Sequence, residues 1–257
     1  MSAHPPSLVT SALLPVPHGF TTRAGGVSEG PYASLNLRFM EGDLRERVEE
    51  NHRRLAVMAG AALEALHTVK QVHGDRVVEA AGAGEGTGAL RPPEGEADAL
   101  WTERPEHWVA VGTADCVPVL LVDPEGRRVA AVHSGWRGTE ARIVARAVES
   151  LVARGSRPER LLAAVGPSIQ RCCYVVSEDL GERFTAGFGA EVVLRERGDV
   201  RLDLARAVRD TLLGAGLKAA HVDVLPHCTA CDADRFFSHR RDAGRTGRHL
   251  NFVVHRF

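Results

Sequence analysis

Short apolar segments alternate with amphipathic ones along most of the chain. Residues 108–111, 117–122 and 129–133 are apolar and rich in β-branched side chains, a pattern typical of buried strands. Further strands are expected at 69–72, 76–80, 161–165, 191–194 and 221–225. The pattern predicts a sheet whose central strands are buried.

Three segments have the spacing of amphipathic helices. Residues 44–59 place Val48, Leu55 and Met58 on one face. Thr139 is expected to cap a helix that runs to residue 154, just before Gly155, and a third helix is expected at 202–214. Strands and helices that alternate in this way predict a mixed α/β domain, and a single domain over residues 1–257 is the simplest interpretation at this length.

Composition narrows the class of protein. The 257 residues are 44% hydrophobic, enough to bury a core, and the formal net charge of −1 gives no indication of a nucleic-acid surface. Pro15 and Pro17 break the apolar run near the start, which argues against a signal peptide, and no segment approaches the roughly 18 apolar residues that span a bilayer. The five cysteines are therefore expected to be reduced thiols or metal ligands in the cytoplasm. Residues 80–95, rich in Gly and Pro, are expected to form a loop.

The turn between the strands at 117–122 and 129–132 suggests a geometry for two side chains. The turn reads Asp123-Pro-Glu-Gly126, with Pro at the favoured second position. If Asp123 pairs with Gly126, Cys116 lies directly opposite His133, with Cβ atoms about 4.5–5.5 Å apart. A turn one residue longer would break this register. Pro118 also indicates an edge strand or a strand start.

A cysteine and a histidine at that separation are suited to one metal ion. A catalytic zinc site uses three protein ligands and an open position, where a bound water has its pKa lowered to about 7. His73, in the turn Gln71-Val-His-Gly-Asp75, is the candidate third ligand. A cysteine in a strand can equally be a small buried side chain, so from spacing alone both interpretations stay open.

Several motifs in order along the chain resemble the YfiH-like, or laccase-domain, family. The resemblance extends from residue 18 to the C-terminus. It rests on His18-Gly-Phe-Thr-Thr-Arg23, Gly25-Gly-Val-Ser28, Ser34-Leu-Asn-Leu37, Gln71-Val-His-Gly74, Glu96-Ala-Asp-Ala-Leu100, Thr113-Ala-Asp-Cys-Val-Pro118, His133-Ser-Gly-Trp-Arg-Gly138, Val165-Gly-Pro167 and Phe236-Phe-Ser-His-Arg-Arg-Asp242.

The resemblance implies a fold and an activity. The fold is a single α/β (α+β) sandwich with mixed sheets flanked by helices, in a monomer or at most a weak dimer. The activity is zinc-dependent phosphorolysis of adenosine, inosine, guanosine and methylthioadenosine, with phosphate as co-substrate, together with deamination of adenosine. It makes His73, Cys116 and His133 the zinc ligands and catalytic residues. Nucleoside and phosphate are then the small-molecule partners, and no nucleic acid or membrane is expected.

The motifs also contain candidate substrate and proton-transfer residues. Arginine suits phosphate because its planar guanidinium donates two parallel hydrogen bonds. Arg23 and Arg137 lie inside family motifs, and Arg240 begins a second basic pair with Arg241. Asp115, beside Cys116, is a candidate proton carrier or support for a ligand. Asn36 and Asp98 are weaker candidates, each equally consistent with a structural hydrogen-bonding role.

Three alternatives remain. One Cys and two His resemble a blue-copper ligand set, but the sequence has no His-x-His pair of the kind that multicopper oxidases use, so copper is disfavoured. Cys116 could instead be the nucleophile of a hydrolase that edits peptidoglycan precursors, a role linked to some family members. A non-catalytic zinc protein is the third. Separately, Cys228-Thr-Ala-Cys231 and Cys172-Cys173 could make a four-cysteine set, but adjacent cysteines are expected to be poor ligands of one ion.

Overall fold

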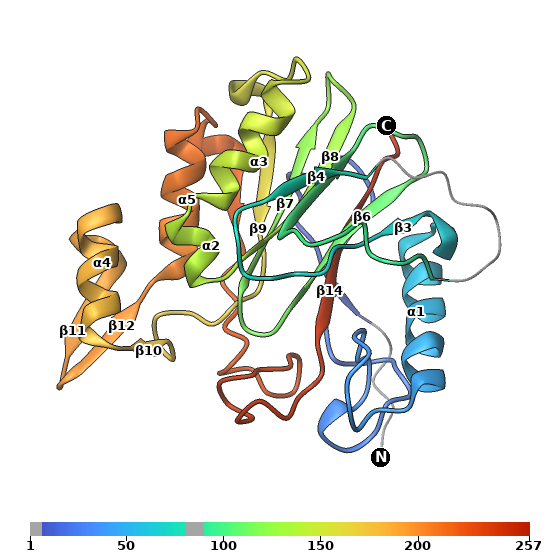
Figure 1. Ribbon diagram of the computed structural model, residues 1–257, viewed down its shortest axis with the longest axis horizontal. Helices are drawn as coiled ribbons and strands as arrows, with labels where there is room; N and C mark the ends of the chain where they lie inside the picture. Colours follow the sequence, from blue (N-terminus) through green and yellow to red (C-terminus); the bar gives the residue numbers. More distant parts are fainter. Residues whose placement is uncertain (1–6, 81–89) are drawn as a thin grey trace.

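Two stacked sheets form the centre of the molecule. The computed structural model describes residues 7–80 and 90–257, and helices lie on the outer side of each sheet (Figure 1). The six-stranded sheet has the order β13 (Val222–Val224), β9 (Leu162–Val165), β7 (Val117–Asp123), β8 (Arg128–Ser134), β5 (Ala99–Thr102), β4 (Val77–Glu79). Its outermost pairs, β13–β9 and β4–β5, are parallel and its inner pairs are antiparallel. The sheet is therefore mixed, as expected.

The second sheet has five strands. Their order is β1 (Leu8–Val9), β2 (His18–Thr21), β14 (His249–Val254), β6 (Trp108–Thr113), β3 (Leu66–His67), and only β3–β6 is parallel. The C-terminal strand β14 thus lies between strands from the first half of the chain. It brings the segment before it, which includes Arg248, to the middle of this sheet.

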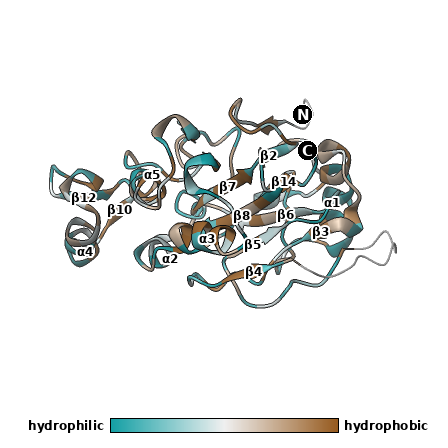
Figure 2. Cartoon of the chain, turned by 90° about the horizontal axis from the view of Figure 1, so that it is seen from above, coloured by the Kyte–Doolittle hydropathy of each residue, from teal (hydrophilic) through white to brown (hydrophobic). Residues whose placement is uncertain are grey.

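Side chains alternate between the two faces of each strand. In β7, Leu120 and Val122 pack between the two sheets, whereas Val119 and Leu121 face the helices. In β6 and β14 the side chains that point away from the first sheet, such as Trp108 and Phe252, pack near α1 (Arg45–Ala59). The result is four layers, helix, sheet, sheet and helix, with the hydrophobic colour concentrated on the inner strands and α3 (Figure 2).

The remaining helices cover the six-stranded sheet or flank it. They are α2 (Trp136–Glu140), α3 (Ile143–Val152), α4 (Glu178–Phe188) and α5 (Leu204–Gly214), with short 3-10 turns at Gly30–Tyr32, Leu63–Ala65, Pro158–Arg160, Ala190–Val192 and Ala219–His221. None of the described helices has both the length and the apolar character that a membrane crossing requires.

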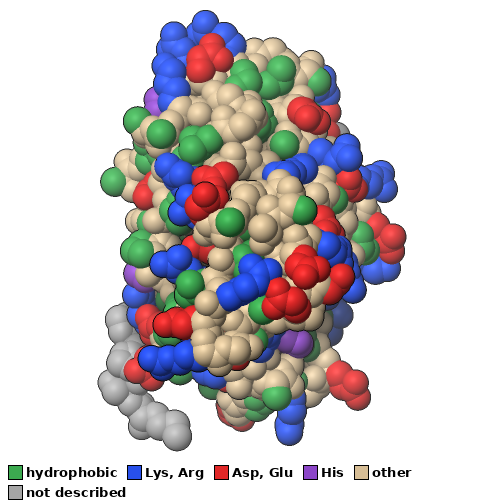
Figure 3. All heavy atoms as spheres, turned by 90° about the vertical axis from the view of Figure 1, so that its left-hand side faces the viewer, with side chains coloured by type: hydrophobic (Ala, Val, Ile, Leu, Met, Phe, Trp, Pro, Cys, Tyr) green, Lys and Arg blue, Asp and Glu red, His purple; other side chains and the backbone are tan. Residues whose placement is uncertain are grey.

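A small antiparallel sheet projects beside this core. It contains β10 (Val175–Val176), β12 (Asp199–Leu202) and β11 (Val193–Glu196), with α4 packed on it (Figure 1). Basic and acidic side chains are interspersed on this side of the molecule (Figure 3). Arg195 of β11, for example, pairs with Glu178 of α4 at 2.7 Å. Such exposed pairs each contribute less than about 1 kcal/mol, so packing rather than charge holds this sheet in place.

The structure confirms the expected fold class and corrects several elements. The helix at 44–59 and the strands from 108 to 133 are confirmed. The strand expected at 69–72 is wrong: β3 ends at His67, and only Lys70 makes an isolated bridge. Residues 190–192 form a 3-10 turn before β11, and the third helix starts after Asp203, which caps it. Residues 81–89 of the loop expected at 80–95 lie outside the described residues.

The helix expected from Thr139 to 154 is two helices. Arg142 adopts a left-handed conformation (φ 63°) that separates α2 from α3. Thr139 lies inside α2 and does not cap it, since its hydroxyl donates to the Gly135 carbonyl at 2.9 Å. Gly155, at φ 92°, does end the α3 segment as expected.

Candidate metal centre and substrate cavity

His73, Cys116 and His133 come together at one end of the six-stranded sheet. His73 precedes β4, Cys116 immediately precedes β7, and His133 lies near the end of β8. Strand β8 runs antiparallel to both β5 and β7, and β4 runs parallel to β5. The C-terminal end of β8 therefore lies at the same edge of the sheet as the N-terminal ends of β4, β5 and β7. One ligand atom from each of the three residues lies within 4.8 Å of the others.

The register that suggested this pair is wrong, yet the pair forms. Asp123 pairs with Arg128 and Pro118 with His133, so the turn is two residues longer than expected. The Asp123 carboxylate accepts hydrogen bonds from the amides of Glu125 (3.2 Å) and Gly126 (2.8 Å), which stabilises this longer loop. A shift of two residues keeps the same side chains on each face, so Cys116 and His133 still approach each other, diagonally rather than directly.

Asp98 fixes the orientation of the two histidines. It is fully buried immediately before β5, and its carboxylate accepts His133 Nδ1 at 2.8 Å. The same carboxylate accepts the backbone amides of Val72 (3.2 Å), His73 (3.0 Å) and Gly74 (2.6 Å). His73 itself adopts φ 61°, so this turn needs the support. With Nδ1 of His133 occupied, its Nε2 is left for the cluster.

Charge is distributed in this cluster as in a thiolate–imidazolium pair. Loss of hydration opposes ionisation of Cys116, but the positive charge and hydrogen bond of His133, with a hydrogen bond from His73, lower the pKa of the thiol to about 6. Burial opposes a charge on His133 as well, but the Cys116 thiolate and Asp98 raise its pKa to about 9. Burial also opposes a charge on Asp98, while hydrogen bonds from His133 and Gly74 hold its pKa below the ordinary value.

The backbone beside the three side chains leaves room for an ion. A Cβ atom at Gly135 would lie 3.1 Å from Cys116 Sγ and 3.1 Å from His73 Cδ2, although the backbone there (φ −75°) suits any residue. The glycine thus keeps the space around the donors open. One thiolate and two imidazoles, supported by a carboxylate behind one imidazole, are a donor set that fits zinc.

The cluster opens into a cavity of about 370 Å³, a size within the usual range for small-molecule sites. Besides the three candidate ligands, the cavity is lined by Arg38, Gln71, Gly112, Thr113, Ala114, Asp115, Trp136, Ile169, Tyr174, Leu204, His239, Arg240 and Arg248. Burial, followed by the charge of Cys116, raises the pKa of the Tyr174 phenol to about 12. The cavity therefore combines aromatic walls, a neutral phenol and three arginines.

Residues 17–256 match the family described as multi-copper polyphenol oxidoreductase laccase. The chain belongs to this family. It is 47% identical to a purine nucleoside phosphorylase of Deinococcus radiodurans, over 94% of this chain and 90% of that one. Adenosine deaminase RL5, from an unknown prokaryotic organism, is 37% identical over 89% of both chains. A crystal structure of YfiH from Bacillus licheniformis, 34% identical, matches with TM-score 0.87 over 92% of this chain and 91% of that chain. The resemblance drawn from the motifs is confirmed.

The laccase-domain motifs do not all reach the cavity. Arg240 and Asp115 line it. Arg23 does not: its guanidinium donates to the carbonyls of Ala33 (2.8 Å) and Ala233 (2.9 Å). Asn36 is fully buried, and its amide is occupied by Arg38, Asp43 and Arg248, so it ties loops together.

Arg137 is exposed and also lies outside the cavity lining. Its guanidinium stacks over the ring of its neighbour Trp136, 4.7 Å from the centroid, and Trp136 is the residue that reaches the cavity. Because α2 starts at Trp136, Arg137 lies inside the helix rather than before it. The structure therefore gives Arg23, Asn36 and Arg137 no contact with a molecule in the cavity.

Two cavity arginines were missed from sequence. Arg38 lies on the loop before α1, and Arg248 immediately precedes β14. Burial first, and then the like charge of Arg38, lower the pKa of Arg248, so the two cations lie close together. Within residues 7–80 and 90–257, neither of them has a carboxylate within ion-pair distance. Arg38 directly follows the Ser34–Leu37 motif, the one signal that could have pointed to it.

Proposed function

We propose that this chain is a zinc-dependent purine nucleoside phosphorylase that also deaminates adenosine. The relatives named purine nucleoside phosphorylase and adenosine deaminase support both activities. One observation carries the proposal: the three donors of His73, Cys116 and His133 converge on the wall of a cavity that three arginines also line. This arrangement supports the proposal that a metal-binding set and an anion-binding set act on the same molecule.

In this proposal zinc is held by His73, Cys116 and His133. Bound there, zinc would supply Lewis-acid chemistry and an activated water at neutral pH. Copper is disfavoured, because the sequence has no His-x-His pair of the kind that multicopper oxidases use. Adenosine, inosine, guanosine and methylthioadenosine are the proposed nucleosides.

The arginines are the proposed phosphate site. Phosphorolysis requires a phosphate oxygen to bond to C1′ of the ribose while the bond to the purine nitrogen breaks, which gives ribose 1-phosphate and the free base. Arg38 and Arg248 offer cations without a bound carboxylate, and Arg240 adds a third. A dianionic phosphate between them would offset their mutual repulsion. This assignment replaces Arg23 and Arg137 and retains Arg240.

Other residues of the cavity are assigned to the nucleoside. Trp136 and Tyr174 offer aromatic faces for a purine ring. Asp115 is the proposed proton-exchanging group: the residue is 8% exposed, and its carboxylate is oriented by the Thr229 hydroxyl (2.7 Å) and the Arg240 amide (2.8 Å). These contacts hold the carboxylate at the cavity wall next to Cys116.

The test combines metal analysis with product analysis. The purified protein is incubated with adenosine, with and without phosphate, and adenine, inosine and hypoxanthine are separated by chromatography. We expect bound zinc, phosphate-dependent release of adenine, and phosphate-independent formation of inosine. His73→Ala and Cys116→Ala should abolish the formation of adenine, inosine and hypoxanthine. His221→Ala, on a 3-10 turn outside the cavity, should leave it unchanged. Bound zinc without nucleoside turnover would refute the proposal.

A second candidate is a hydrolase that acts on peptidoglycan precursors with Cys116 as its nucleophile. The observation that favours it is the contact between the Cys116 thiol and His133, which lowers the pKa of the thiol. The two candidates differ in the purified protein. A nucleophilic Cys116 is alkylated rapidly, whereas a zinc-bound Cys116 is protected until a chelator removes the metal.

Three further assignments accompany the proposal. Residues 1–257 are taken as one catalytic domain, in keeping with a family match that extends from residue 17 to 256. The protein is proposed to act in the cytoplasm, because its five cysteines are unpaired and a reducing compartment keeps them so. It is proposed to be a monomer or weak dimer, with no nucleic-acid partner.

A further inference from the structure

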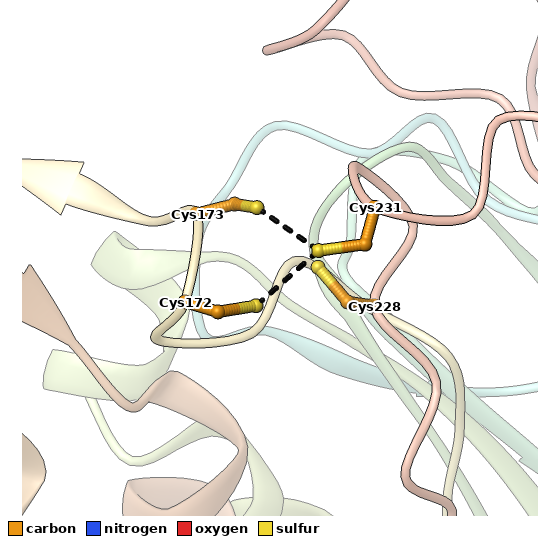
Figure 4. A group of neighbouring side chains, drawn as sticks. All are labelled: Cys172, Cys173, Cys228 and Cys231. Carbon is orange, nitrogen blue, oxygen red and sulfur yellow. Dashed lines mark hydrogen bonds between the residues drawn. The ribbon is translucent and has the colours of Figure 1, made fainter.

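Four cysteines outside the cavity converge on one point. Cys172 and Cys173 lie on the turn between β9 and β10, and Cys228 and Cys231 lie on the segment after β13. Their sulfur atoms point toward one another from two facing loops, all within 4.8 Å (Figure 4). Adjacent cysteines were expected to be poor ligands of one ion, yet Cys172 and Cys173, on the turn at residues 171–173, both lie in this cluster.

The distances between the sulfur atoms show whether the four thiols suit a disulfide, a single metal ion or a cluster of several metal ions. Cys231 Sγ lies 3.5 Å from Cys172 Sγ and 3.2 Å from Cys173 Sγ. A disulfide requires about 2.0 Å between sulfurs. Four thiolates around a tetrahedral zinc, each at about 2.3 Å from the ion, are about 3.8 Å from one another. The observed spacing thus suits a single ion in the middle, and is too small for a cluster of several irons.

Backbone amides stabilise a thiolate at this place. The Gln170 amide donates to Cys228 Sγ at 3.4 Å. The amides of Cys231 and Ala230 also lie against this sulfur atom. Donors aimed at a sulfur atom support the ionised form, which is the form that binds metals.

We propose that Cys172, Cys173, Cys228 and Cys231 hold a second zinc ion as a closed, structural four-thiolate site. Four sulfur donors in a compact set favour zinc or a single iron over magnesium, calcium or copper(II). No position is left for a substrate, so this ion has no part in the chemistry of the cavity. The inference does not depend on the proposed phosphorylase activity.

The site has a structural task that the contacts identify. It joins the segment after β9 to the segment after β13, which touch otherwise through the Ser168–Cys228 bridge and the Thr229 amide to the Ser168 carbonyl (3.1 Å). Thr229 lies between Cys228 and Cys231, and its hydroxyl donates to Asp115 Oδ1. The Ile169 amide donates to the Asp115 backbone carbonyl at 3.0 Å. The ion would therefore fix both segments that hold Asp115.

Metal content of single variants tests the proposal. Full-length protein is purified from zinc-supplemented cells and its metal is measured by mass spectrometry. We expect about two zinc ions per chain in the unmodified protein, and about one in both Cys231→Ser and Cys116→Ala, each variant losing a different ion. Cys231→Ser should also unfold at a lower temperature. If Cys231→Ser contains as much zinc as the unmodified protein, the proposal is overturned.

A second measurement avoids dependence on a variant that fails to fold. Cys116→Ala retains all four thiols, so loading it with cobalt(II) should give the thiolate-to-metal absorption of a tetrahedral four-sulfur site. If Cys116→Ala binds no cobalt, or mass spectrometry of the unmodified protein finds a disulfide between two of the four cysteines, the four-thiolate site does not exist. Loss of nucleoside turnover with both ions retained would instead refute the proposed activity alone.

Discussion

Asp98 supports a quantitative prediction because every hydrogen-bonding position of its carboxylate is used. Oδ1 accepts the His73 amide and His133 Nδ1, and Oδ2 accepts the amides of Val72 and Gly74. In Asp98→Asn only one oxygen remains, with room for two of the four donors. Either the Val72 and Gly74 amides lose their acceptor, or the new amide group faces His73 and His133.

Both orientations of the asparagine damage the metal centre. In the first orientation the backbone amides of Val72 and Gly74 have no acceptor. Each unpaired amide costs about 1–3 kcal/mol, so the free energy of unfolding falls by about 2–6 kcal/mol. In the second, the asparagine N–H₂ donates to Nδ1 of His133, which places the proton on Nε2 and removes this nitrogen as a ligand. Loss of such a supporting carboxylate typically costs 10- to 100-fold in metal affinity, or about 1.4–2.7 kcal/mol.

The assay is competition for zinc between the protein and a chelator of known affinity. It is done in a Cys231→Ser background so that one site titrates, with folding checked by circular dichroism. Asp123→Ala is the matched control. Asp123 is also buried, at the far end of β7, and its removal unpairs two amides, those of Glu125 and Gly126. It should lower stability and leave zinc affinity unchanged. Equal affinity in Asp98→Asn and the parent, or equal losses in both variants, would refute the reasoning.

Three further predictions concern the same site. Gly135→Ala should lower zinc affinity at least about tenfold, because the added Cβ crowds the side chains of two proposed ligands. Gly214→Ala is the control and should leave zinc affinity unchanged, because a Cβ added there has no atom within 4 Å. Equal zinc affinities of the two variants in competition with a chelator would contradict this prediction. Arg248→Ala should raise the KM for phosphate at least about tenfold, and the exposed Arg157→Ala should leave it unchanged. In metal-free protein the pKa of Cys116, about 6, predicts that iodoacetamide alkylates this thiol quickly from pH 9 to 7 and more slowly only below about pH 6. The alkylation of an ordinary thiol slows below about pH 8.5. A pH profile like that of an ordinary thiol would show that His133 does not activate Cys116.

The sequence predicted what depends on neighbouring residues and on motifs. The run of β-branched residues from 108 to 133 predicted β6, β7 and β8, because burial of central strands leaves a local pattern. The approach of Cys116 and His133 was predicted by an argument about faces of a strand pair, which survives a register error of two residues. No pairing argument could reach His73, which was proposed from its place in the turn at Gln71–Asp75 and then implied as a ligand by the family resemblance.

What the sequence could not predict depends on contacts between distant segments. Arg38 and Arg248 are about two hundred residues apart in the chain, and they meet because β14 inserts beside β2 and β6. Arg23 looked equally suited to phosphate, but its guanidinium lies against the carbonyls of Ala33 and Ala233, outside the cavity lining. Arg248 also donates to two backbone carbonyls, those of Thr246 and Gly247, but it lines the cavity. The number of unpaired cations in a cavity is a property of tertiary packing, not of a motif.

Asp115 connects the two candidate metal sites. It is adjacent to Cys116 in the chain, and its partner Thr229, 114 residues away, is flanked by Cys228 and Cys231. The strand edge that presents His73, Cys116 and His133 is held by the hydrogen bonds of Asp98 and by the six-stranded sheet. The loops that carry Thr229 and Arg240 have little regular structure of their own. A closed thiolate site between those loops would give them the rigidity that a proton-exchanging carboxylate requires, without adding a group to the cavity. Loss of that site is therefore expected to affect turnover through the position of Asp115, with the zinc at His73 still bound.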